Sequence, residues 1–157
     1  MSPPDYSIVK TYTLDQAKQF RDFVIADVQK SIDAKTNFLT ALGLLCYTEF
    51  LGALINDSVG KTANSRKNFE TGLYAMGEGY KQFDQHLKSQ LKNKGVYKIF
   101  RCGMVHSYFI DHNLTIVACD NKSQGLGLGQ TKSGELGIAT ANYFWDFKAA
   151  FDKYIQF

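Results

Sequence analysis

The chain has little of what disulfide-bonded and metal-binding proteins require. It contains three cysteines among 157 residues, and no two of them form a Cys-x-x-Cys pair: Cys46, Cys102 and Cys119. The three histidines show no zinc-ligand spacing relative to these cysteines. An odd and unpaired set of cysteines is typical of free thiols in a reducing compartment. We therefore expect no disulfide, no metal site and no other cofactor.

Export and membrane signals are also missing. The first six residues, Met-Ser-Pro-Pro-Asp-Tyr, lack the basic start and apolar run of a signal peptide, which predicts a cytoplasmic protein. Residues 38–55 approach the length of a membrane span, but they include Glu49. A carboxylate inside lipid costs roughly 2.5 kcal/mol or more. We expect this segment to be the central helix of a soluble bundle that does not enter a membrane.

No nucleotide-binding fingerprint is found in the glycine-rich part of the chain. The run Gly-Leu-Gly-Leu-Gly at 125–129 lacks the spacing of a dinucleotide-binding turn, and no Gly-Lys-Ser/Thr follows it. Its alternation with period two instead predicts a hairpin. Ser133-Gly134 supplies a turn signal ahead of a further short strand.

Helical periodicity dominates the remainder. Hydrophobic residues at 45% and charged residues at 21% fit one folded domain with its own core. Apolar residues recur every three or four positions in five stretches, with a capping-box pattern at Thr13-Leu-Asp-Gln16. The predicted helices begin near residues 13, 36, 66, 96 and 140. We expect a mainly α, up-and-down helical bundle of about five helices. It would form one domain over residues 1–157, with a small β-hairpin insert at about 113–140.

The fourth predicted helix carries the most informative residues, Arg101 and His106, followed by Tyr108. An arginine can hold a phosphate with two parallel hydrogen bonds, and a histidine can move a proton near neutral pH. These are the two functions that RNA cleavage without a metal requires. The alternative is structural, with Arg101 paired to Asp111 or Glu49 and His106 satisfied in the core. Cys46 and Cys102 are expected to be core or lining residues rather than nucleophiles.

The Arg-x4-His-x-Tyr motif in the fourth helix of a small bundle resembles the HEPN domain family. It is most similar to the toxin-type members that pair with minimal nucleotidyltransferases. The resemblance implies a compact homodimer and a metal-independent ribonuclease whose Arg101 and His106 line a cleft at the dimer interface. It also implies a role for Tyr108, as a phosphate ligand or a site of regulatory modification. Cys102 stands where the family often has a polar residue, and the β insert is not part of the minimal fold.

Helical geometry adds its own expectation about this motif. At about 100° per residue, His106 lies about 140° from Arg101 around a regular helix. One regular helix therefore does not aim both groups at one point. Either the helix is irregular near Gly103, or the site is assembled from two copies across a two-fold axis.

The charge distribution supports a polyanionic partner. Residues 85–110 carry five lysines or arginines and no Asp or Glu, so the rest of the chain sums to −2 within a net charge of +3. A solvated helix face would explain this, and so would an RNA-binding surface made by Lys88, Lys92, Lys94 and Lys98. Glu49 is a lone carboxylate on an apolar helix and needs a partner. Arg101 and His106 are the candidates, although Glu49 could instead reach solvent beside Tyr47.

Three functional hypotheses remain. The first is a HEPN-like endoribonuclease that acts as a toxin or defence component with an antitoxin partner. In it Arg101, His106 and Tyr108 form the site, Glu49 supports it, and the four lysines gather RNA. The second is a non-catalytic module that binds nucleotide, RNA or protein. The third is a structural dimer whose basic surface has no ligand.

Overall fold

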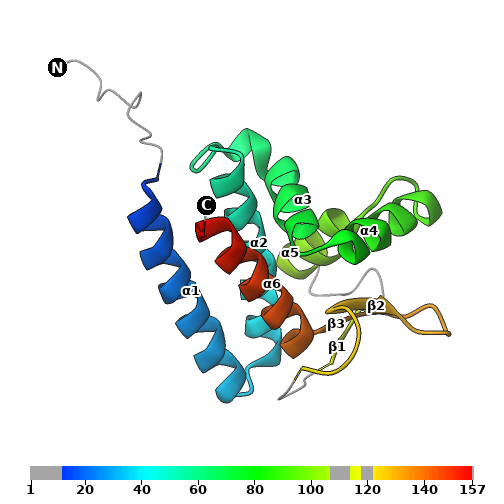
Figure 1. Cartoon of the computed structure of the whole chain (residues 1–157). Helices are drawn as coiled ribbons and strands as arrows, with labels where there is room; N and C mark the ends of the chain where they lie inside the picture. Colours follow the sequence, from blue (N-terminus) through cyan, green and yellow to red (C-terminus); the bar gives the residue numbers. More distant parts are fainter. Residues whose placement is uncertain (1–11, 107–113, 118–121, 157) are drawn as a thin grey trace.

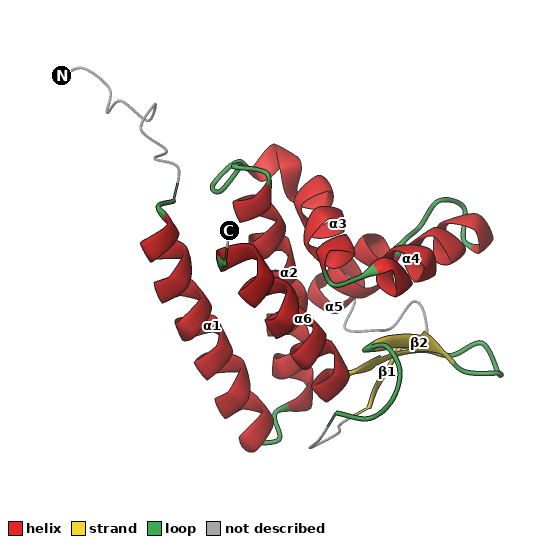
Figure 2. Ribbon diagram, in the orientation of Figure 1, coloured by secondary structure: helices red, strands yellow, loops and turns green. Residues whose placement is uncertain are grey.

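The structure is a computed structural model that describes residues 12–106, 114–117 and 122–156. Six α-helices and a three-stranded sheet make up most of this part of the chain, which confirms the mainly α class (Figures 1 and 2). The α-helices are α1 (Leu14–Asp33), α2 (Asn37–Ile55), α3 (Ser65–Ala75), α4 (Glu78–Gln90), α5 (Gly103–His106) and α6 (Thr140–Ile155). A short 3-10 helix η1 (Thr62–Asn64) precedes α3, and a π-helical segment η2 (Tyr97–Cys102) precedes α5.

Helix α1 begins with the predicted capping box. The Thr13 hydroxyl accepts from the Gln16 backbone N–H at 3.2 Å, and the Gln16 side chain accepts from the Thr13 backbone N–H at 2.9 Å. Its inward face buries Ala17, Val24 and Val28. These three residues belong to the apolar repeat in the sequence, so the helix and its orientation follow from local pattern alone.

Helix α2 is the centre of the bundle and packs against α1, α3 and α6 (Figure 1). By length and composition it could cross a membrane, and half of that stretch is buried inside the protein. The core helix of a globular bundle has the same properties, so the cellular location stays a prediction. What the structure does show is that α2 forms part of the hydrophobic core.

Two glycines bring α2 and α3 into direct contact. A Cβ on Gly52 would collide with the backbone carbonyl of Asn68, and one on Gly72 would collide with the carbonyl of Thr48. The side chain of Asn68 lies in the same crossing, where it accepts from Ser58 Oγ at 2.7 Å. Glycine at these two positions therefore permits the close packing of α2 and α3.

The third predicted helix is not continuous. It divides into α3 and α4 at Gly77, whose φ of 135° is accessible to glycine and strained for other residues. The amphipathic pattern continues across the break, because Leu73, Tyr80 and Leu87 are all buried. Periodicity alone thus did not reveal the change of direction, which lets α4 run out over the sheet (Figure 1).

The insert forms a three-stranded sheet in the order β1-β3-β2. Strands β2 (Leu128–Gln130) and β3 (Leu136–Ala139) pair antiparallel, with Gly134 at φ 89° in the connecting turn, which confirms the predicted hairpin. Strand β1 (Leu114–Val117) pairs with β3 in parallel, an arrangement that a hairpin pattern does not predict. Strand β3 leads directly into α6, so the sheet is anchored to the bundle.

Candidate functional site

Arg101 projects from the π-helical segment η2. The neighbouring residues Ile99 and Phe100 are fully buried, and Met104 in the following helix α5 is also buried. The backbone is therefore fixed to the core on one side, while the Arg101 side chain keeps 22% of its surface exposed. Single π-helical turns occur often at functional sites, where they change the direction of a side chain. The irregularity expected near Gly103 is present, and it lies just before that residue.

Glu49 is the partner of Arg101. Arg101 Nε donates to Glu49 Oε2 at 2.9 Å, and the Glu49 side chain is 19% exposed. Burial alone would lower the pKa of Arg101, but the nearby Glu49 carboxylate raises it above its ordinary value. The expectation that the lone carboxylate of α2 needs a cation is confirmed. This contact also belongs to the structural alternative for Arg101, so the pairing by itself does not establish catalysis.

The contact with Glu49 uses only the Nε edge of the guanidinium. Among the described residues, neither Nη atom of Arg101 donates a hydrogen bond. A planar guanidinium offers two parallel N–H donors on its outer edge, which match two oxygens of a phosphate. Glu49 therefore orients Arg101, and among the described residues it leaves the outer edge of the guanidinium without an acceptor.

Arg101 lines a pocket of about 240 Å³ between α2, the loop after it and the beginning of α3. Helix α2 contributes residues spaced along one face, and η2 contributes Arg101. The lining residues are Cys46, Glu49, Phe50, Ala53, Ser58, Val59, Gly60, Lys61, Ser65, Asn68 and Arg101. Polar and charged groups form a large share of this wall, so the pocket suits a polar or anionic ligand.

Cys46 lines the pocket as a protonated thiol. Burial raises the pKa of Cys46, and the neighbouring Arg101 offsets this only in part. A thiol with a raised pKa is a poor nucleophile at neutral pH. The prediction that Cys46 is a lining residue is consistent with this setting. On η2, burial raises the pKa of Tyr97, and the nearby Cys102 raises it further.

His106 is exposed at the end of α5. Residues 103–106 are α-helical, whereas Arg101 lies on the π-helical segment before them. No contact joins His106 to Arg101 or to its pocket in the described structure. Tyr108 lies outside the described residues, as does Asp111. The structure therefore joins Arg101 to Glu49 and leaves His106 on a different part of the surface of a single chain.

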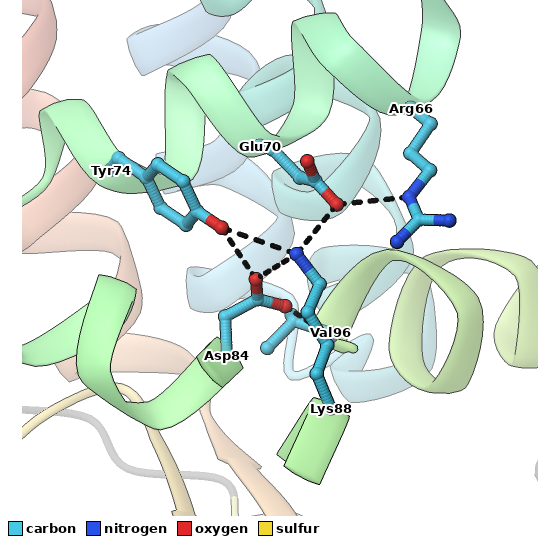
Figure 3. A network of polar contacts seen from close by, with 6 residues as sticks. All are labelled: Arg66, Glu70, Tyr74, Asp84, Lys88 and Val96. Carbon is cyan, nitrogen blue, oxygen red and sulfur yellow. Dashed lines mark hydrogen bonds and ion pairs between the residues drawn. The ribbon is translucent and has the colours of Figure 1, made fainter. Parts of the chain in front are cut away.

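Lys88 belongs to a network of ionic contacts between α3 and α4, drawn in Figure 3. Its ammonium lies 2.7 Å from Asp84 Oδ2 and 2.9 Å from Glu70 Oε1, and it also contacts the Tyr74 hydroxyl at 3.3 Å. Burial alone would lower the pKa of Lys88, but these hydrogen bonds raise it above its ordinary value. Two carboxylates already compensate the charge of Lys88, so it contributes little to attracting RNA.

The other three predicted RNA-binding lysines have a different setting. Lys92, Lys94 and Lys98 are exposed and form no ion pair within the described residues. Lys92 lies in the turn after α4 at φ 51°. Lys98 lies on η2, three residues before Arg101. These side chains are available to a polyanion.

Two residues important to the site were not identified from the sequence. Lys61 lines the pocket from the loop after α2, and the run Gly60-Lys61-Thr62 in that polar loop was the available signal. Asp84 is fully buried and receives the Val96 backbone N–H at 2.7 Å. Its position on the buried stripe of α4, between Tyr80 and Leu87, could have identified it.

Comparisons of this chain with protein-family models, curated proteins and solved structures found no match. The HEPN resemblance consequently depends on Arg101, His106 and Tyr108 alone.

Proposed function

We propose that the protein is a metal-independent endoribonuclease of HEPN type. One observation supports the proposal: Glu49 contacts the Nε edge of Arg101 in a pocket that Arg101 lines, and no described residue accepts a hydrogen bond from either Nη atom. A guanidinium presented in this way can bind the scissile phosphate and stabilise the extra negative charge of the transition state. Tyr108 is proposed as a further phosphate ligand or modification site on the strength of the motif alone.

Proton transfer is assigned to His106. The ribose 2′-hydroxyl attacks the adjacent phosphorus, the bond from phosphorus to the 5′-oxygen breaks, and a 2′,3′-cyclic phosphate remains. His106 takes the 2′-hydroxyl proton as general base, or gives a proton to the leaving 5′-oxygen as general acid. Water exchanges the other proton, so one proton leaves the 2′-hydroxyl and one reaches the 5′-oxygen.

We propose that the site is completed by a second copy of the chain. Within one copy no contact among the described residues joins His106 to Arg101, and His106 does not line the Arg101 pocket. A two-fold axis places the same surface opposite itself. His106 of one protomer would then approach Arg101 of its partner. A protein partner of antitoxin type, such as a minimal nucleotidyltransferase, follows from the motif resemblance alone.

The basic surface serves to collect the substrate. Lys92, Lys94 and Lys98 are exposed and belong to the same acid-free segment as Arg101. Their attraction for the RNA backbone weakens as the salt concentration rises, because binding releases counterions from the RNA.

The test is cleavage of a mixed-sequence RNA in the presence of EDTA. Wild-type protein is expected to produce fragments with 2′,3′-cyclic phosphate ends. Both Arg101→Ala and His106→Ala should lose at least about a hundredfold in rate, since each group contributes on this scale. His86→Ala is the matched control, because His86 is an equally exposed histidine on α4. Cleavage by His106→Ala at the wild-type rate would overturn the mechanism.

A non-catalytic binding module is the second candidate. The separation of His106 from the Arg101 pocket favours it, because binding requires Arg101 and not a proton donor. This alternative predicts RNA binding without cleavage, lost in Arg101→Ala and retained in His106→Ala. Filter binding of the same RNA, measured beside the cleavage assay, separates the two functions.

A further inference from the structure

The Arg101 pocket contains a second cation that no part of the proposed mechanism uses. Lys61 lines the pocket from the loop between α2 and α3, 40 residues away from Arg101 in the sequence. We infer that this pocket binds the phosphate of a single nucleotide unit between Arg101 and Lys61, with the Phe50 ring against its sugar or base. The choice of a nucleotide as the ligand rests on the proposed function. The inference adds which residues of the pocket recognise that nucleotide.

The charges of the lining residues favour an anion. Glu49 compensates one positive charge by its contact with Arg101. Lys61 is exposed and has no ion pair in the described part of the chain, so it adds a positive charge that nothing on the wall balances. The guanidinium provides two directed donors and the ammonium a mobile third, a combination suited to the oxygens of a phosphate.

Backbone hydrogen bonds shape the loop that carries Lys61. The Ser58 backbone N–H donates to the Ala53 carbonyl at 2.9 Å, and the Lys61 N–H donates to the Ser58 carbonyl at 3.1 Å. Gly60 has φ 80°, a conformation that glycine adopts without strain. These contacts close the loop into a turn that holds the Lys61 backbone at the rim of the pocket.

Two neutral polar residues of the wall, Ser58 and Asn68, are hydrogen bonded to each other. Ser58 Oγ donates to Asn68 Oδ1 at 2.7 Å, and the same oxygen accepts from Asn56 Nδ2 at 3.1 Å. The Ser58 hydroxyl proton is therefore occupied, and the charged donors of the wall are those of Arg101 and Lys61.

Phe50 supplies the apolar part of the wall. Its ring stacks on Phe20 with centroids 4.5 Å apart and meets Tyr12 edge-on at 6.3 Å. These contacts fix the ring, and Phe50 also lines the pocket. A fixed aromatic ring beside a phosphate site is how proteins hold single-stranded nucleic acid, because any base can pack on it.

The size of the pocket limits the ligand. Its volume of about 240 Å³ lies below the range of roughly 300–1,000 Å³ that is usual for drug-sized ligands. One phosphate and one sugar or base fit this space better than a base-paired helix does. The substrate class that follows is single-stranded RNA, bound one nucleotide at a time.

The test is calorimetric titration of the full chain with adenosine 5′-monophosphate, adenosine and inorganic phosphate. The monophosphate is expected to bind more tightly than either fragment. Lys61→Ala and Arg101→Ala should each weaken it about tenfold or more, because each removes a charged hydrogen-bond donor. Phe50→Leu should weaken the monophosphate and leave inorganic phosphate unchanged. Lys67→Ala is the matched control, since Lys67 is an exposed lysine of α3 that does not line the pocket.

The outcome is independent of cleavage. Binding of the monophosphate that depends on Lys61, in a protein that does not cleave RNA, would keep this inference and remove the proposed reaction. Equal affinity in wild type, Lys61→Ala and Lys67→Ala would overturn the inference, even if RNA were cleaved. Absence of binding in wild-type protein would overturn it as well.

Discussion

At the scale of single residues, Asp84 links the core to the candidate site. Its carboxylate accepts from the Tyr74 hydroxyl at 2.6 Å, from Lys88, and from the backbone N–H of Val96 at 2.7 Å. Val96 is the residue immediately before η2, which carries Arg101. A Cβ on Gly95 would collide with this carboxylate, so glycine is needed for the close approach. Asp84 therefore fixes the point from which the motif segment starts.

Removing the Asp84 carboxylate should destabilise the fold strongly. Asp84→Ala is expected to lower the free energy of unfolding by about 3–5 kcal/mol, because it leaves a buried backbone N–H and the Tyr74 hydroxyl without their acceptor and removes one of the two carboxylates that pair with Lys88. Asp84→Asn retains an acceptor for Val96 and should lose less. Urea denaturation measures both variants.

The control for Asp84 is Glu78→Ala. Glu78 is an exposed residue of the same helix, with a side chain 65% exposed and a contact to Lys81 of 3.7 Å. Exposed ion pairs contribute roughly 0–1 kcal/mol, so this change should have little effect. Similar losses in Asp84→Ala and Glu78→Ala would show that Asp84 does not have the linking role.

Local sequence identified Arg101 as one of two candidate partners for Glu49, but it did not reveal the role of Lys88. A lone carboxylate on the most apolar helix requires a cation, and this requirement can be read from α2 itself. Whether a lysine is available to a ligand depends instead on what folds against it. Glu70 lies on a different helix, α3, and the contact with Lys88 forms only because the chain turns at Gly77. Lys61 was missed for a similar reason, since its pocket is formed by three separate segments.

At the scale of elements, the crossing of α2 and α3 decides how the bundle packs. Gly52 and Gly72 let the two backbones touch, and this contact lets the α2–α3 loop with Lys61 line the same pocket as Glu49. The candidate pocket is therefore a consequence of the helix crossing. A change that separates the two helices should widen or abolish it.

Two alanine substitutions within α2 should have opposite effects. Gly52→Ala would place a Cβ against the Asn68 carbonyl, so we expect a loss of at least about 2 kcal/mol in the free energy of unfolding. Gly43→Ala meets only the edge of the Tyr47 ring, at 3.8 Å, and should gain about 0.5–1 kcal/mol from its better helix propensity. Thermal denaturation of both variants is the measurement. Destabilisation by Gly43→Ala, or none by Gly52→Ala, would contradict the packing described.

The same contrast explains how far the fold could be predicted. Helices α1 and α6 each bury a regular stripe of apolar residues, so periodicity predicted them. The turn at Gly77 and the parallel pairing of β1 with β3 depend on contacts between distant segments. No window of sequence contains that information. The tight β2–β3 hairpin, by contrast, has a local turn signal and was predicted.

At the scale of the whole molecule, positive charge is concentrated in one segment of the chain. The acid-free segment 85–110 supplies Lys92, Lys94, Lys98 and Arg101, whereas the rest of the chain is net negative. Two copies related by a two-fold axis near this segment would present one continuous basic surface to RNA. The like charges of the two copies would have to be spaced around the axis or neutralised by the ligand.

A composite site can be distinguished from a single-chain site by mixing inactive variants. We expect a heterodimer of Arg101→Ala with His106→Ala to recover about half of the wild-type RNA cleavage, because one of its two sites has both residues intact. The two variants carry different affinity tags, are expressed together and are purified on both tags. Each variant alone is the baseline.

The matched control reverses the pattern. A heterodimer of wild-type chain with the double variant Arg101→Ala/His106→Ala places one altered residue in each composite site, so it should be inactive. If Arg101 and His106 act within one chain, the second heterodimer would keep about half of the activity and the first would have none. Failure of the two tags to co-purify would also contradict the proposal, because a site shared by two protomers cannot exist in a monomer.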